Sequence, residues 1–89
     1  MPCAHKDSIL IERPSEAEKV GAVCEDCVAI GSDWVHLRVC RTCGHVGCCD
    51  ESEYRHARAH WNSSDHPIIS SMEPREVWTY CFIEDDLVD

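Results

Sequence analysis

The pattern of apolar and polar residues along the chain predicts several short β-strands. Residues 34–39 alternate most clearly and are rich in residues that favour strands. Residues 66–70 and 77–83 are predicted strands as well, with a turn at residues 73–76 between them. A fourth short strand is predicted at residues 8–11.

One helix is expected over residues 51–61. Asp50 precedes Glu53 by three residues, which is the spacing of a capping box at a helix start. His56 and His60 are four residues apart, so the helix would present both imidazoles from the same face.

Length and composition change this picture, because a chain of 89 residues makes a small core. A single domain of this size buries only about 60% of its unfolded surface, so apolar packing alone leaves it marginally stable. The chain has one Phe and no long apolar run. A structural zinc ion can contribute on the order of 10 kcal/mol to folding, so we expect metal to replace part of the core.

Most of the eight cysteines and six histidines occur at spacings that suit zinc. A short Cys or His pair lets one turn supply two ligands to one ion. The candidates are Cys3 and His5, the two Cys-x-x-Cys pairs Cys24–Cys27 and Cys40–Cys43, and then Cys48, His56, His60, His66 and Cys81. This pattern predicts at least two structural zinc ions.

A disulfide scaffold of the secreted type is the alternative interpretation of so many cysteines. It fits poorly, because residues 1–6 lack a basic and then apolar signal segment and because the interleaved histidines have no role in such a scaffold. No stretch has the apolar length that crosses a membrane. We therefore expect a cytoplasmic protein whose thiols are reduced and held by metal.

The formal net charge of −9 argues against a nucleic-acid partner. The exceptions to this acidity are arginines near the metal candidates: Arg38 and Arg41 flank Cys40, and Arg55 and Arg58 flank His56. They form either a local basic spot or solvated pairs with nearby carboxylates, the second being favoured. No apolar stripe indicates an obligate dimer, so a monomer is expected.

The motifs in their order resemble the zinc finger of ubiquitin-specific proteases, the UBP-type finger. They are Cys24-x-x-Cys27, Trp34-Val-His-Leu, Cys40-x-x-Cys43 followed by Cys48, His56-x-x-x-His60, and His66-Pro67. The chain is most similar to the short stand-alone members in bacterial genomes. The resemblance implies one α+β domain over residues 1–89, with a twisted, mostly antiparallel sheet packed against one or two helices. The acidic tail from about residue 86 is expected to be disordered.

The resemblance also implies two interleaved zinc sites. One consists of Cys24, Cys27, Cys48 and His56, and the other of Cys40, Cys43, His60 and His66. A third site would use Cys3, His5 and Cys81, with Glu84 at the position of the family's last cysteine; the alternative is a vestigial site without metal. Protein ligands fill all four positions of the first two sites, so we expect no catalytic zinc and no enzyme activity.

Eukaryotic members of the family bind the free C-terminal Gly-Gly of ubiquitin in an aromatic pocket that contains an arginine. The resemblance places Trp34, Tyr80 and Phe82 in such a pocket, but Asp50 stands at the arginine position and Cys49 at a glycine position. We therefore expect a non-catalytic module that recognises the C-terminal tail of a protein or peptide, with weak or no binding to ubiquitin. The alternative is a structural or regulatory zinc protein without a pocket; a RING-like ligase module or a Cys-x-x-Cys oxidoreductase is less favoured.

Overall fold

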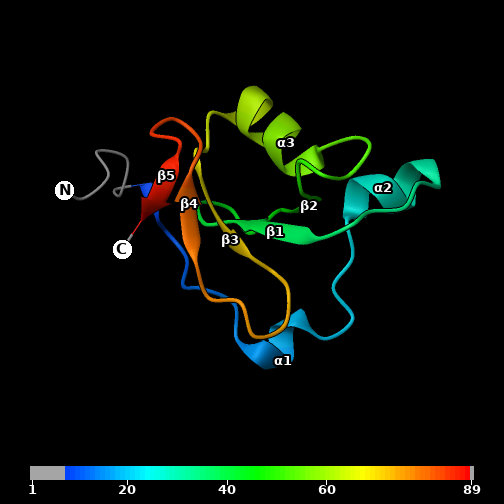
Figure 1. Cartoon of the computed structure of the whole chain (residues 1–89), viewed down its shortest axis with the longest axis horizontal. Helices are drawn as coiled ribbons and strands as arrows, with labels where there is room; N and C mark the ends of the chain where they lie inside the picture. The colour runs from blue at the N-terminus through cyan, green and yellow to red at the C-terminus, as the bar shows by residue number, and fades with distance from the viewer. Residues whose placement is uncertain (1–7, 89) are drawn as a thin grey trace.

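The computed structural model describes residues 8–88, which form a five-stranded antiparallel sheet and three helices. The sheet order is β2-β1-β3-β4-β5 (Figure 1). The strands are β1 (Leu37–Cys40), β2 (Val46–Cys48), β3 (Ile68–Ser71), β4 (Thr79–Cys81) and β5 (Asp86–Val88). The helices are α1 (Glu16–Lys19), α2 (Glu25–Ile30) and α3 (His56–Ser64). The predicted fold class, a small α+β structure with a mostly antiparallel sheet, is confirmed.

The strand register gives the sheet two different faces. Cys40 pairs with Ile69, Ile69 with Tyr80, and Tyr80 with Leu87, so these four side chains share one face. Helix α3 contacts β1 and β2, and α1 lies on the opposite side of the sheet (Figure 1). The face that carries Tyr80 is therefore the face beside α3.

Helix α3 packs unusually close to β2 because residue 47 is glycine. A Cβ atom at Gly47 would lie 2.7 Å from the backbone nitrogen of Ala57 and 2.9 Å from the carbonyl carbon of His56. Both atoms belong to the backbone of the first turn of α3. A side chain at residue 47 would therefore push the helix away from β2. Gly47 thus sets the distance between the helix and the sheet.

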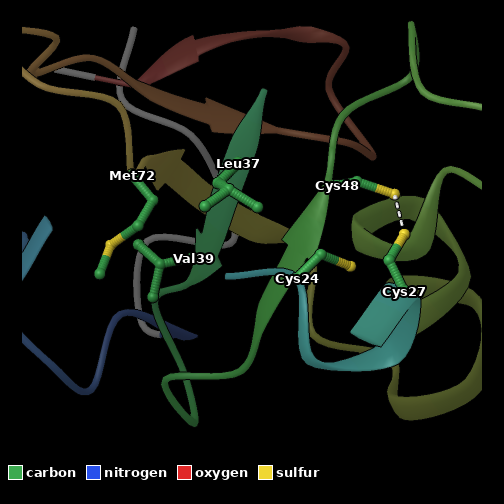
Figure 2. Packing of buried hydrophobic residues seen from close by; sticks show 6 residues of the cluster. All are labelled: Cys24, Cys27, Leu37, Val39, Cys48 and Met72. Atoms are coloured by element: carbon green, nitrogen blue, oxygen red, sulfur yellow. Dashed lines mark hydrogen bonds between the residues drawn. The ribbon is translucent and has the colours of Figure 1, made fainter. Parts of the chain in front are cut away.

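The apolar core is small and includes cysteines. Leu37, Val39 and Met72 pack in one cluster with Cys24, Cys27 and Cys48 (Figure 2). The second cluster consists of Ile68, Cys81 and Val88, against which Ile9 packs. Both clusters are small and contain cysteines, so we expect burial alone to stabilise the fold only marginally.

The helix prediction was partly wrong about where the helix begins. Helix α3 starts at His56, five residues later than expected, and Arg55 precedes it in the left-handed conformation (φ 48°). The predicted capping box does not form, because the Asp50 carboxylate binds the Arg58 guanidinium instead. A long-range ion pair has replaced the local cap.

Two predictions near the ends of the chain are corrected. Residues 8–11 form no strand; the backbone amides of Leu10 and Ile11 both donate to the Arg41 carbonyl, at 2.9 and 3.0 Å, and the side chains of Arg41 and Thr42 donate to the carbonyls of Ile11 and Ser8. Residues 86–88, expected in a disordered tail, form β5 and pair with β4, and the Val88 side chain is only 9% exposed. Helix α2 and strand β2 were not predicted. Within residues 8–88, no helix has the length and apolarity to cross a bilayer.

Replacing Gly47 with alanine should destabilise the metal-loaded protein by about 1–3 kcal/mol, the usual cost of overpacking. The added methyl group would meet the backbone of α3, which must shift. Chemical denaturation of the zinc-loaded protein measures the change. Gly21→Ala is the matched control: a Cβ there meets nothing within 4 Å, so only the strain of its positive φ (75°) remains, about 1–2 kcal/mol. A loss well below about 1 kcal/mol for Gly47→Ala would contradict the close-packing interpretation.

Candidate functional site: two metal centres and a cavity

The first metal centre joins three elements. Cys24 precedes α2, Cys27 lies within it, Cys48 ends β2, and His56 begins α3. The Nδ1 atom of His56 lies 3.4 Å from Cys24 Sγ and 3.2 Å from Cys27 Sγ. Cys48 Sγ lies 3.8 Å from Cys27 Sγ and 3.5 Å from His56 Nδ1 (Figure 2 shows the two sulfurs). Four zinc ligands in a tetrahedron are about 3.3–3.8 Å apart, so these distances fit the ion.

The second centre lies at the turn between β1 and β2. Cys40 ends β1, Cys43 is in the turn, His60 comes from α3, and His66 precedes β3. Cys40 Sγ lies 3.6 Å from His66 Nδ1, and Cys43 Sγ lies 3.3 Å from His60 Nε2. In each centre the four ligand atoms all lie within 4.8 Å of one another.

The two centres are interleaved along the sequence, as expected. His56 and His60 lie one turn apart on α3, and each faces a different centre. The donors are three thiols and one imidazole in the first centre and two of each in the second, which are typical sets for structural zinc. The prediction of two clusters suited to zinc is confirmed, and the ligand role of each residue stays a prediction.

A cavity of about 360 Å³ lies on the face of the sheet beside α3. Its aromatic wall consists of Trp78, Tyr80 and Phe82, and the rings of Tyr80 and Phe82 meet edge to face with centroids 5.6 Å apart. Trp61 of α3 stacks on Phe82. The remaining lining residues are Arg38, Cys49, Asp50, Glu51, Ala57, Ile69 and Leu87.

Of the four residues expected at a peptide site, Tyr80, Phe82 and Asp50 line this cavity and Trp34 does not. Trp34 is partly buried and packs instead against the cluster that contains Leu37 and Cys24. Trp78 lies at the cavity and was not singled out from the sequence. The signal for it was present, since residues 78, 80 and 82 alternate along one strand and therefore face the same side.

Asp50 forms an ion pair with Arg58 at the cavity. The Arg58 Nε atom donates to both carboxylate oxygens, at 3.0 and 3.1 Å, and Nη2 donates at 2.6 Å. These hydrogen bonds hold the pKa of Asp50 below its usual range. The Arg58 guanidinium also lies 4.8 Å above the Phe82 ring. Tyr80 donates its hydroxyl proton to Asp85, and that hydrogen bond raises the pKa of Tyr80 to about 12.

A family model described as "Zn-finger in ubiquitin-hydrolases and other protein" matches residues 24–89. The chain belongs to this UBP-type zinc-finger family. It is 35% identical over 65 residues to ubiquitin carboxyl-terminal hydrolase 44 of Ailuropoda melanoleuca, and the match covers 73% of this chain and 8% of that protein. The same-named protein of Xenopus tropicalis is also 35% identical over 65 residues, with 9% of it covered. The chain therefore spans less than a tenth of the length of these hydrolases.

A solved structure extends the comparison to the whole of this zinc finger. The solution NMR structure of protein RPA1320 from Rhodopseudomonas palustris aligns with a TM-score of 0.80 and 46% sequence identity. The alignment covers 100% of this chain and 82% of that protein. Hence a bacterial protein shares the fold of this UBP-type finger.

In the zinc finger, burial favours the protonated form of the cysteine thiols unless a cation stabilises the thiolate. Burial raises the pKa of Cys24 and Cys40, and raises that of Cys27 to about 12. Zinc binds the thiolate, so the ion must displace these protons when it enters. Zinc uptake by this UBP-type finger therefore releases protons, and lowering the pH should release the metal.

His45 connects the two centres: it contacts Asp26 near the first centre and His60 of the second. His45 Nε2 lies 2.8 Å from the carboxylate of Asp26, and Asp26 lies in the sequence between Cys24 and Cys27 of the first centre. The ring of His45 stacks on that of His60, with centroids 4.5 Å apart. Asp26 was not foreseen from the sequence, because its partner comes from a different element.

The third zinc site lies partly outside the described residues, since Cys3 and His5 precede residue 8. Cys81 is fully buried, and the Glu84 backbone amide donates to its sulfur at 3.5 Å. Cys81 and Glu84 are thus close to each other, and the third site stays a prediction.

Removing zinc by strong chelation, or replacing Cys40 with serine, should unfold the finger cooperatively, because the small core cannot hold α2, α3 and the sheet together. Amide dispersion in NMR spectra before and after chelation checks this. Cys49→Ser is the control: Cys49 belongs to neither cluster, so stability should change by less than about 1 kcal/mol. Native-like dispersion in the metal-free protein would show that zinc is dispensable for the fold.

The third site predicts three zinc ions per chain. If Glu84 closes it, Glu84→Ala should weaken only the last ion to bind, because the other two centres do not use this carboxylate. Metal analysis during stepwise chelation measures both quantities. Two ions per chain, together with free alkylation of Cys3 in the folded protein, would show that the site is vestigial; Cys81 is buried and gives no such readout.

Proposed function

We propose that this UBP-type zinc finger is a non-catalytic module that binds the C-terminal tail of a protein or peptide in the cavity beside α3. The observation that carries the proposal is the aromatic wall of Trp78, Tyr80 and Phe82 around a cavity of about 360 Å³. Ligand pockets are typically concave and apolar, of about 300–1,000 Å³, with a few polar groups, and this cavity has that character. Its volume suits a few residues of an extended chain.

The metal centres support a structural role for zinc. Each cluster offers four protein ligands, so no coordination position is left for a substrate or an activated water. The similarity to ubiquitin hydrolases covers only 8–9% of those proteins and carries no hydrolase activity to this chain. The zinc ions hold α3 against the sheet, and this arrangement forms the cavity.

The proposal includes the setting in which the module works. A net charge of −9 disfavours nucleic acid and anionic membrane surfaces as partners. The described cysteines form no disulfides among residues 8–88, and reduced thiols are typical of the cytoplasm. We propose a cytoplasmic monomer whose partner is a protein tail.

Affinity selection of random N-acetylated hexapeptides with free C-termini on the zinc-loaded finger should yield ligands. Titrating them into the labelled protein should shift the resonances of Trp78, Tyr80 and Phe82, because those rings line the cavity. Trp34 is the internal control, since it packs elsewhere and should not shift. If no tail peptide is selected, the proposal fails and the protein is a structural or regulatory zinc protein.

Ubiquitin with a free C-terminus is one arm of this titration, and we expect no binding or only millimolar binding. Asp50 stands where the family pocket has its arginine and is paired with Arg58, so it supplies no positive charge for the terminal carboxylate, and Cys49 occupies space there. The double change Asp50→Arg with Cys49→Gly should strengthen ubiquitin binding, because a charge-assisted bond contributes roughly 1.5–3 kcal/mol. Micromolar affinity in the unmodified protein would contradict the charge argument.

A further inference from the structure

The face of the sheet opposite the aromatic cavity carries a second concavity, of about 340 Å³. Val46 lines it and pairs with Val39 in the register of β1 and β2, so these two side chains share one face. Arg38, the neighbour of Val39 in β1, lines the aromatic cavity. Because neighbouring residues of a strand point to opposite faces, the two concavities lie on opposite sides of the sheet. A ligand in one leaves the other open.

This second concavity, the acidic groove, combines apolar side chains with two carboxylates. Val20 and Val23 come from the segment between α1 and α2 and are 80% and 40% exposed. Met72, which follows β3, is only 9% exposed. Glu18 of α1 and Glu25 of α2 are exposed and supply the charge. Exposed valines that meet at a concave surface, unlike apolar residues scattered singly, are typical of an interaction site.

The two glutamates of the acidic groove lack a cationic partner. Among the described residues, no lysine or arginine pairs with either of them, and none lines the groove. Lys19, the neighbour of Glu18 in the chain, binds the Glu16 carboxylate at 2.9 Å instead. His45 Nδ1 lies 3.9 Å from the Glu25 carboxylate, which is too far for a hydrogen bond. We propose that the acidic groove binds a basic segment of a partner protein, with the charged end of a lysine or arginine between Glu18 and Glu25 and its methylene stem against the valines.

One wall of the acidic groove is held in place before any ligand binds. The Glu18 carboxylate accepts a hydrogen bond from the backbone amide of Ser15 at 2.9 Å. This bond lowers the pKa of Glu18, so the group stays ionised at neutral pH. Helix α1 is in turn tied to the turn before β4, because Lys19 donates to the Glu76 carbonyl at 2.6 Å. Little conformational entropy is therefore lost at this wall when a ligand binds.

Charge complementarity favours a basic segment over the other possible ligands. An anionic segment would be repelled by Glu18 and Glu25. A purely apolar segment would take both carboxylates out of water without giving them a partner, which is unfavourable. A lysine or arginine avoids both costs, and the net charge of −9 attracts a cationic partner over longer distances. This inference does not depend on tail binding, which concerns the other face of the sheet.

The test selects random hexapeptides, N-acetylated and C-amidated, on the zinc-loaded protein with labelled methionine methyl groups. The amide end removes the terminal carboxylate, so binding does not depend on a free tail. Peptides that shift the Met72 methyl resonance should contain a lysine or arginine beside an apolar residue, because Met72 lines the acidic groove. Replacing that basic residue of the peptide with glutamine should weaken binding about 3-fold to 10-fold, the range for exposed ion pairs with two carboxylates.

Glu18→Gln should weaken the basic peptides about 2-fold to 5-fold, since glutamine keeps the hydrogen bond from Ser15 but loses the charge. Glu18→Gln combined with Glu25→Gln should remove the preference for a basic peptide over its glutamine counterpart. Glu53→Gln is the matched control, because it removes the same charge from an exposed position outside both concavities. It should leave the binding of the basic peptides unchanged.

Selection of no peptide that shifts the Met72 methyl resonance, or only of such peptides without a basic residue, would overturn the proposal. Equal binding of a basic peptide and its glutamine counterpart to the unmodified protein would overturn it as well. Tail binding is judged separately, by the resonances of Trp78 and Tyr80. If the double variant loses zinc or amide dispersion, the comparison of the two peptides on the unmodified protein decides.

Discussion

Convergence of cysteine and histidine side chains at two points is the constraint on which the rest of the structure depends. The first centre brings α2, β2 and the start of α3 together, and the second ties α3 to the turn after β1. The apolar clusters are small and include some of the same cysteines. Ion binding and core packing are therefore coupled, because a thiol that leaves the metal also leaves the core.

The position of α3 follows from these centres and from Gly47. His56 and His60 each face a different centre, so the helix can neither rotate nor slide without losing a ligand contact. The missing side chain at Gly47 lets the helix backbone approach β2. The cavity forms beside this helix, over the face of the sheet that carries Ile69, Tyr80 and Leu87. The two clusters thus position the elements that form the cavity, although none of their residues lines it.

A charged residue at the cavity presents its charge to a ligand only where no partner of opposite charge neutralises it. Asp50 alone would repel an anionic ligand, but Arg58 neutralises it with three hydrogen bonds. Arg38 and Asp50 line the same cavity, yet only Asp50 has a close partner of opposite charge. A chain end with a carboxylate is therefore compatible with a domain whose total charge is −9.

The amino-acid sequence by itself predicted the two Cys/His clusters, the central strands and the family, because these depend on local spacings and on residue types within one segment. Only the tertiary structure decided which aromatic rings line the cavity: Trp78 lies there, and Trp34 packs against the buried cluster of Leu37 and Cys24 instead. It also decided that Asp50 pairs with Arg58 rather than capping a helix, and that the acidic tail becomes β5. Each of these outcomes is a contact between different elements or strands, whose energy depends on how they pack and leaves no local signature in the sequence.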